Sequence, residues 1–292
     1  MSSCYVNSKL EERSFKDRAF MGATHAMSGV ALFLAIAAFA PDFTEKALGT
    51  SVIWVIILGA LVTAGAALLP DLDNTTSTAK NSLGPLGLVL SYFFRTSSAI
   101  IQTVVRTPRD DPEPNPHRGA WHTIPAAALL GYLTYLGTKI GGSVDIPLIG
   151  TITGGGVFAL VIAFLMTHLA LSGLASSFMK KIKKSSAVGE LVALAISFTL
   201  TALIFVNIPT DISFWWLGVS VGFGMFVHIL GDSMTTAGVP ILFPLSAIIK
   251  GKFWWTTRFL TIKAGGIVEN TIFLPGFTVL SIVSIVKILI DM

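Results

Sequence analysis

The chain has 292 residues, of which 53% are hydrophobic and only 12% are charged, and its formal net charge is +4. Soluble domains carry about 25% charged residues, so this composition excludes an ordinary soluble globular protein and indicates an integral membrane protein. The single cysteine, Cys4, excludes an internal disulfide framework and a metal site built on cysteines.

The first 20 residues are polar and charged, and they lack the apolar core of a cleaved signal peptide. We therefore expect a cytoplasmic N-terminal segment at 1–20 and one membrane domain at 21–292.

Seven apolar stretches are long enough to predict membrane spans, since a spanning helix needs about 20 mostly apolar residues. They lie at about 22–40, 52–69, 121–138, 154–179, 187–206, 213–231 and 271–290. Two other stretches predict interfacial or re-entrant segments. These are 83–94, with an amphipathic continuation to about 105, and 239–260, which carries two prolines and the pair Trp254–Trp255. The predicted fold is all-α, a polytopic bundle of about seven transmembrane helices with short interfacial or re-entrant helices.

The lysines and arginines predict the orientation of this bundle. If the N-terminus is cytoplasmic, 17 of the 20 fall in inside segments, and the exceptions are Lys46, Lys139 and Lys287. The opposite orientation would invert this bias. We therefore expect a multi-pass protein of the cytoplasmic (inner) membrane with its N-terminus inside. The run KKIKK at 180–184 is interpreted as a positive-inside anchor, with lipid-headgroup contact as the alternative.

Eight unusual polar residues from four spans fall at the inner ends in this topology. They are His25, Asp71, Asp73, His117, Arg118, His122, His228 and Asp232. The outer loops carry acidic residues but no histidine. His228 and Asp232 are four residues apart and share one helix face. Ionisable residues within or beside spans are costly, so their concentration at one depth predicts a common site.

The residue types predict a divalent metal centre, because histidine nitrogens with aspartate oxygens and no thiolates suit zinc first, with manganese, iron or magnesium as alternatives. The predicted metal ligands are His25, Asp71, Asp73, His122, His228 and Asp232. They exceed one tetrahedral shell. Two ions, or one ion with carboxylates that orient the histidines, both remain open. A bound ion would lower the pKa of water to about 7 and supply a hydroxide nucleophile.

Arg118, His117 and Glu269 are the predicted catalytic residues. The guanidinium of Arg118 offers a planar fork that suits a phosphate, although it can also be a positive-inside residue. His117 is closer to a loop and can instead be solvent-exposed. Glu269 is a catalytic or orienting carboxylate, or only a surface charge. Gly119 is expected to let the backbone turn tightly, and His168 is interpreted as a packed histidine with a local partner.

Four sequence blocks resemble the YdjM-like membrane-bound metal-dependent hydrolases. In chain order they are THAMSG at 24–29, LLPDLD at 68–73 followed by NSLGPLG at 81–87, HRGAWHT at 117–123, and HILGDSMTTAGVPILFP at 228–244. The resemblance covers roughly 20–135 and 220–275. It implies an inner-membrane, metal-dependent hydrolase. Its metal and catalytic residues carry over onto the eight residues above, and less directly onto Glu269.

The chain departs from the family pattern in several places. Asn74 stands where the family often has histidine, and Trp121 and Thr123 replace the usual threonine and serine beside His122. The region 139–212 is longer than in compact members. We interpret it as an inserted pair of spans, which preserves the sidedness of everything downstream.

The sequence thus predicts a hydrolase in which a metal-activated water attacks a phosphoester of a lipid or lipid-linked substrate at the cytoplasmic face. Membrane lipids are the expected partners, nucleic acid is not, and the oligomeric state stays open. A metal-ion or small-solute transporter that uses the same cluster is the first alternative. It predicts ligands near the midplane or a polar path across the bilayer, and the outer halves of the spans offer little such path. A non-catalytic membrane scaffold is the second alternative. It predicts a metal that has no open ligand position and only joins the inner helix ends.

Overall fold

The fold is described from a computed structural model. The structure describes residues 22–48, 53–105, 107, 117–146, 150–182, 186–208, 213–243, 245 and 256–291. The predicted N-terminal segment 1–20, part of the run KKIKK, and the pair Trp254–Trp255 lie outside the described residues.

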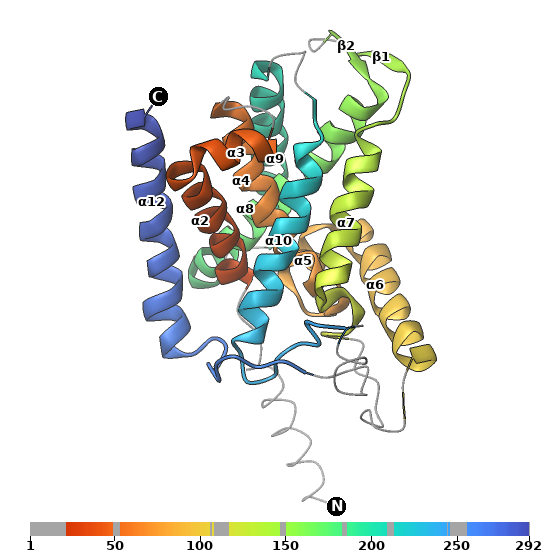
Figure 1. The fold of residues 1–292 in the computed structure, drawn as a ribbon, viewed down its shortest axis with the longest axis vertical. Coiled ribbons are helices and arrows are strands. Elements are labelled where there is room, and N and C mark those ends of the chain that lie inside the picture. The colour runs from red at the N-terminus through yellow and green to blue at the C-terminus, as the bar shows by residue number, and fades with distance from the viewer. Residues whose placement is uncertain are drawn as a thin grey trace, which may run out of the picture.

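The described chain is mainly helical, as predicted, and most of its helices run along the long axis of the molecule (Figure 1). In chain order the elements are α2 (Gly22–Phe39), α3 (Pro41–Leu48), α4 (Ile53–Ala66), η1 (Pro70–Asp73), α5 (Thr78–Ser82), α6 (Gly84–Val105), η2 (Ala120–His122), α7 (Ile124–Gly137), β1 (Ser143–Ile146), β2 (Gly150–Thr153), α8 (Gly154–Ile182), α9 (Ser186–Asn207), α10 (Trp216–Ser233), η3 (Glu269–Phe273) and α12 (Leu274–Asp291).

Five helical segments of the described chain are long and apolar enough to cross a membrane. They are Gly22–Phe39, Ile53–Asp73, Gly84–Val105, Gly154–Ala175 and Glu269–Asp291. Ile124–Gly137 and Leu191–Asn207 are apolar but shorter. Length and composition therefore support a membrane protein with several apolar helices. The predicted number of seven stays a prediction.

Two of the predicted spans differ in the structure for local reasons. The predicted span 121–138 is a helix only from Ile124, because the preceding residues form the turn η2 and Pro125 lies in the first helical turn. The predicted span 213–231 corresponds to helix α10, which is not among the five long apolar segments of the described chain. His228 and Asp232 near its end lower its mean hydropathy. The segment 83–94 and its continuation form one helix of 22 residues, α6, rather than a short one.

A short antiparallel hairpin is the one departure from an all-α fold in the described chain. Strands β1 and β2 pair with Ser143 opposite Thr153 and Ile146 opposite Gly150. They lie at the upper end of the molecule in Figure 1, away from the ends where α4 and α10 finish.

Helix α4 lies at the centre of the bundle and packs against α2, α8 and α10. Glycines allow these helices to approach closely. A Cβ at Gly65 would lie 2.0 Å from the carbonyl oxygen of Met166 on α8, and one at Gly224 on α10 would lie 2.3 Å from the carbonyl oxygen of Thr63. Backbone in contact with backbone fixes the ends of α4 and α10 relative to each other.

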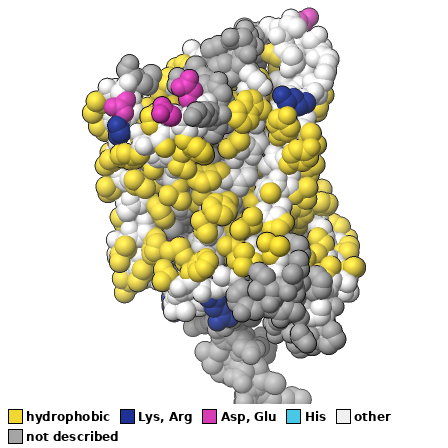
Figure 2. Space-filling model, in the orientation of Figure 1, with side chains coloured by type: hydrophobic (Ala, Val, Ile, Leu, Met, Phe, Trp, Pro, Cys, Tyr) yellow, Lys and Arg dark blue, Asp and Glu magenta, His cyan; other side chains and the backbone are white. Residues whose placement is uncertain are grey.

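The outer surface is apolar around its middle. Figure 2 shows hydrophobic side chains over the central band of one face, with the coloured acidic and basic side chains near its upper and lower ends. Most residues of α12 and α6 face outward, and their exposed side chains include Ile290, Val104 and Tyr92. An apolar belt between two polar ends is what a bilayer requires of a spanning protein.

Candidate metal centre

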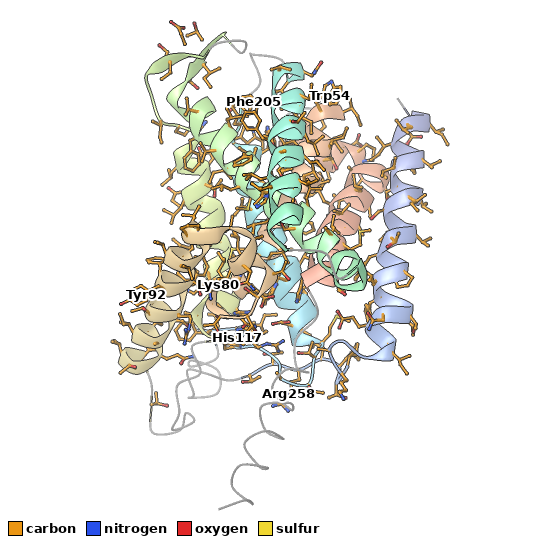
Figure 3. All side chains as sticks on the ribbon, turned by 180° about the vertical axis from the view of Figure 1, so that it is seen from behind. Trp54, Lys80, Tyr92, His117, Phe205 and Arg258 are labelled. Carbon is orange, nitrogen blue, oxygen red and sulfur yellow. The ribbon has the colours of Figure 1, made fainter. Side chains whose placement is uncertain are left out.

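Four chain segments bring the predicted polar residues together at the lower end of the bundle in Figure 1. His25 lies in the first turns of α2, and Asp71 and Asp73 lie in η1 directly after α4. His122 ends η2 just before α7, and the last two turns of α10 carry His228 and Asp232. The prediction that these ends meet is therefore confirmed. Figure 3 shows His117 at this end.

Local sequence explains how η1 presents two carboxylates. Pro70 occupies the first position of this 3-10 turn, where its missing N–H costs nothing, and it ends the regular helix α4. The short turn then carries Asp71 and Asp73, which are 7% and 1% exposed. Two carboxylates this deeply buried need partners, because an isolated buried charge is strongly unfavourable.

The turn before η2 has an unexpected backbone. Arg118 has a φ of 59°, the left-handed region that residues with a Cβ rarely adopt, whereas Gly119 has a φ of −91°. Arg118 thus takes the left-handed conformation in this turn, and the expectation that Gly119 lets the backbone turn tightly stays a prediction. The amide of Arg118 donates a hydrogen bond to Asp73 Oδ2 at 3.2 Å, which stabilises this conformation.

Asp232 is the central residue of the cluster and is completely buried. Its Oδ1 accepts a hydrogen bond from Arg118 Nη2 at 2.9 Å and lies 3.3 Å from His25 Nε2. Its Oδ2 lies 3.6 Å from His122 Nε2 and 3.6 Å from His228 Nε2. Residues from three separate elements and one turn therefore converge on a single carboxylate.

Arg118 is bound within the protein. Besides Asp232, its guanidinium donates through Nη1 to Thr235 Oγ1 at 2.9 Å and to the carbonyl oxygen of Gly238 at 3.3 Å. Thr235 and Gly238 follow α10 in the block that carries the family resemblance, but their contacts with Arg118 could not be read from their spacing. These bonds fix both Asp232 and the chain that follows it.

The tautomer of His228 follows from its partner. Nδ1 of His228 lies 2.7 Å from the carbonyl oxygen of Ala67, which can only accept, so Nδ1 carries the proton. In the neutral ring, Nε2 then has a lone pair and lies 3.9 Å from Asp71 Oδ1. The ring of His25 stacks on that of His228 with centroids 3.9 Å apart. A histidine oriented in this way by a carbonyl is typical of metal ligands.

Asp73 contacts the two histidines on the other side of the cluster. Its Oδ1 lies 2.6 Å from His117 Nδ1, and its Oδ2 lies 3.5 Å from His122 Nδ1. The side chain of His117 is 27% exposed, the most open of the predicted metal and catalytic histidines, while His122 is completely buried.

The pKa values of these two histidines, which precede α7, differ in direction. Burial alone would lower the pKa of His117, but the hydrogen bond and the charge of Asp73 outweigh burial and raise its pKa above the ordinary value. Burial, together with the charge of His228, holds the pKa of His122 well below the ordinary value. His122 is therefore neutral at neutral pH, the form that binds metal ions.

Several polar atoms of the cluster are buried and have no hydrogen-bond partner within the described chain. They are both ring nitrogens of His122, His228 Nε2, Asp232 Oδ2 and Asp71 Oδ1. Each such atom costs about 1–3 kcal/mol when it is left unsatisfied. Three overlapping groups of residues could each hold an ion, namely His25 with His228 and Asp232, Asp71 with His122 and His228, and Asp73 with His117 and His122. The donor set and its unsatisfied atoms fit a divalent metal.

Trp121 attaches the turn η2 to α6, a contact that the sequence did not predict. Its indole Nε1 donates to the carbonyl oxygen of Phe94 at 3.1 Å and lies 2.9 Å from Ser97 Oγ. The amide of Ala120 donates to Ser98 Oγ at 3.0 Å. The neighbouring His122 is thereby held at a fixed distance from α6.

Replacing Trp121 with phenylalanine keeps an aromatic ring but removes the indole N–H. We expect the free energy of unfolding to fall by about 0.5–1.5 kcal/mol, because the bond from the indole N–H is lost while the Phe94 carbonyl still accepts from the Ser97 hydroxyl at 3.2 Å. Thermal unfolding in detergent measures the change, with Tyr132→Phe on the exposed face of α7 as the control. Equal unfolding temperatures for the two variants would contradict a stabilising role for the indole.

Glu269 and His168 lie outside the three candidate metal groups. Glu269 is completely buried at the start of η3, where its Oε2 accepts a hydrogen bond from the amide of Gly265 at 2.6 Å. His168 on α8 contacts the carbonyl oxygen of Ser82 at 2.9 Å and the hydroxyl of Ser197 at 3.3 Å. These contacts agree with the interpretation of His168 as a packed histidine, although both partners lie far from it in the chain. A catalytic role for Glu269 stays a prediction.

Comparison with known proteins gives one family. A family model described as YdjM inner membrane protein matches residues 20–177 and 190–289. The match includes every predicted metal and catalytic residue, and it extends through most of the region 139–212. The interpretation of that region as an inserted pair of spans stays a prediction. No curated protein and no solved structure matches the chain.

Proposed function

Because the chain belongs to the YdjM inner membrane protein family, we propose that it is a metal-dependent hydrolase of the inner membrane that cleaves a phosphoester of a lipid or lipid-linked molecule. The observation that carries the proposal is the set of buried ligand atoms around Asp232. Nε2 of His122 and Nε2 of His228 each lie 3.6 Å from Asp232 Oδ2. None of these three atoms has a hydrogen-bond partner in the described chain.

Both separations from Asp232 Oδ2 fit those of ligand atoms around one ion. In a tetrahedral shell with bonds of about 2.0–2.2 Å, neighbouring ligand atoms lie about 3.3–3.6 Å apart, longer than most hydrogen bonds. The residues that would hold it come from two overlapping groups, His25 with His228 and Asp232, and Asp71 with His122 and His228. Zinc is the first expectation for such a mixture of nitrogen and oxygen donors. A bound divalent ion would supply Lewis-acid activation of water for attack on phosphorus.

The remaining polar residues have distinct roles in this proposal. Arg118 holds Asp232 in place, since its guanidinium already binds Asp232, Thr235 and Gly238. A contact between Arg118 and a substrate phosphate stays part of the proposal. His117 is partly exposed and bonded to Asp73, so it can move a proton between the centre and the water phase.

The position of the cluster supports a substrate at the membrane surface. The cluster lies at one end of a bundle with an apolar belt, so a group bound there would sit near the lipid headgroups (Figures 1 and 2). The bias of lysine and arginine supports the cytoplasmic side as the location of this end.

A transporter that uses the same residues is the second candidate. Above the cluster on α10, the Ser220 hydroxyl and the Trp216 indole nitrogen are buried without hydrogen-bond partners among the described residues. Buried polar atoms of this kind could line a hydrated path through the bundle. Uptake of a divalent ion into sealed proteoliposomes, above the rate in protein-free vesicles, would favour transport over hydrolysis.

Removal of the metal tests the proposed function directly. Purified protein is expected to contain a divalent ion by elemental analysis and to hydrolyse at least one member of a panel of phosphoesters and phospholipids. A chelator should abolish the activity, and adding the ion back should restore it. Protein that never binds a divalent ion would refute the metal centre. Metal without any turnover would favour the scaffold or the transporter.

A further inference from the structure

We infer that the centre holds one ion rather than two, and that Asp73 positions His117 and His122 instead of binding the metal. The inference rests on the proposed metal centre and deepens it. The number of candidate ligands leaves two arrangements open, namely two ions, or one ion with carboxylates that orient the histidines. The inference selects the second.

The first step concerns Asp73, whose two oxygens are both taken by donors of the protein. Oδ1 lies 2.6 Å from Nδ1 of His117, a hydrogen-bond distance shorter than the separation of two ligands on one ion. Oδ2 accepts the amide of Arg118 at 3.2 Å. A metal shared by Asp73 Oδ1 and His117 Nδ1 would have to push these two atoms apart and break this hydrogen bond.

The second step concerns the two candidate groups without Asp73, which are His25 with His228 and Asp232, and Asp71 with His122 and His228. Both groups contain His228, whose Nδ1 carries the proton bonded to the Ala67 carbonyl, so only its Nε2 can bind an ion, and it can bind one. His122 Nε2 lies 3.6 Å from Asp232 Oδ2, and its Nδ1 lies 3.5 Å from Asp73 Oδ2. With one ion at Nε2, Nδ1 keeps its proton on the side of the Asp73 carboxylate, and a carboxylate that orients a metal-bound histidine is common in metalloproteins.

The third step contrasts Asp73 with Asp71 and Asp232. Asp71 Oδ1 and Asp232 Oδ2 are buried atoms without hydrogen-bond partners in the described chain, whereas neither oxygen of Asp73 is in that condition. Asp71 Oδ1 lies 3.9 Å from His228 Nε2, and Asp232 Oδ2 lies 3.6 Å from it. The three aspartates thus separate into two with an unsatisfied oxygen beside a histidine nitrogen and one that accepts hydrogen bonds.

The test counts ions in the wild-type protein and then in Asp73→Asn. We expect one tightly bound divalent ion per chain in the purified wild type, measured by elemental analysis and by titration with Zn²⁺. Asp73→Asn should still bind one ion, with an affinity about 10–100-fold weaker, because the amide orients His122 less well. His228→Ala should lose tight binding. Asp42→Asn, the same change at an exposed position on α3, is the matched control and should leave binding unchanged.

Substitution of Co²⁺ gives a readout that loss of stability alone would not produce. The visible absorption of the bound Co²⁺ should keep its intensity in Asp73→Asn, because the number of ligands is unchanged, and it should disappear in His228→Ala.

Two ions per wild-type chain, or an Asp73→Asn protein that holds one ion fewer than the wild type, would overturn the inference while leaving the proposed hydrolase intact. The count in the wild type decides the matter even if Asp73→Asn fails to fold. Wild type without any ion would overturn both the inference and the proposed function.

Discussion

Replacement of Asp232 with alanine is expected to remove the bound ion, abolish hydrolysis and destabilise the fold. The substitution deletes the oxygen that lies 3.6 Å from both His122 Nε2 and His228 Nε2. It also removes the partner of the buried Arg118 guanidinium at 2.9 Å. Breaking a buried ion pair from one side costs about 3–5 kcal/mol, because the other charge stays buried.

The variant Asp232→Asn separates these two effects. The amide oxygen can still accept from Arg118, so most of the stability should return, but the charged ligand is lost. We expect Asp232→Asn to unfold closer to the wild-type temperature and still to bind the ion at least 100-fold more weakly. Elemental analysis, thermal unfolding and the hydrolysis panel measure the three quantities, with Asp42→Ala as the exposed control. An Asp232→Asn protein with full metal content and activity would rule out Asp232 as a ligand.

The second large effect is expected from Gly224→Ala, a change of one methyl group on α10. The new Cβ would lie 2.3 Å from the carbonyl oxygen of Thr63 and 2.7 Å from the Cβ of Ala66, both on α4. Neither atom can move without moving its helix, so α10 must shift away from α4. Overpacking of this kind costs about 1–3 kcal/mol or more. The shift should also stretch the bond from His228 to the Ala67 carbonyl, which is 2.7 Å long.

Gly224→Ala should therefore lower both the unfolding temperature and the affinity for the ion, although it touches no ligand. Gly276→Ala on α12 is the matched control, because a Cβ at that position meets no atom within 4 Å. Alanine is favoured over glycine in helices by about 1 kcal/mol, so the control should be neutral or slightly stabilising. Equal metal affinity in the two variants would show that the separation of α4 and α10 does not set the geometry of the centre.

The members of the site could be predicted from the sequence because charged and imidazole groups are expensive in apolar helices. His25, Asp71, His228 and Asp232 stand out against their surroundings for that reason. The alternation of spans then places their helix ends on one side. This argument requires only the sidedness of each segment and no knowledge of which helices touch.

Contacts made by residues that are ordinary in the sequence could not be predicted. Trp121 looks like an interfacial tryptophan, yet its indole attaches η2 to α6. Arg118 looks like a positive-inside residue or an anion ligand, yet its guanidinium binds Asp232. Glu269 is buried but lies outside the candidate metal groups. For Trp121 and Arg118 the partner is far away in the chain, and no local pattern marks the pair.

Composition and apolar periods alone determined that this is a helical membrane protein with histidines and aspartates gathered at one end. Only the tertiary structure decided which of their side-chain atoms form hydrogen bonds and which do not. Both oxygens of Asp73 accept hydrogen bonds, whereas Asp232 Oδ2 has no hydrogen-bond partner in the described chain. Nε2 of His228 faces the cluster because its Nδ1 is bonded to the Ala67 carbonyl. The physical reason is that the two properties depend on different numbers of residues. The cost of burying charge acts on each residue by itself, whereas ligand distances depend on how closely α4 and α10 pack.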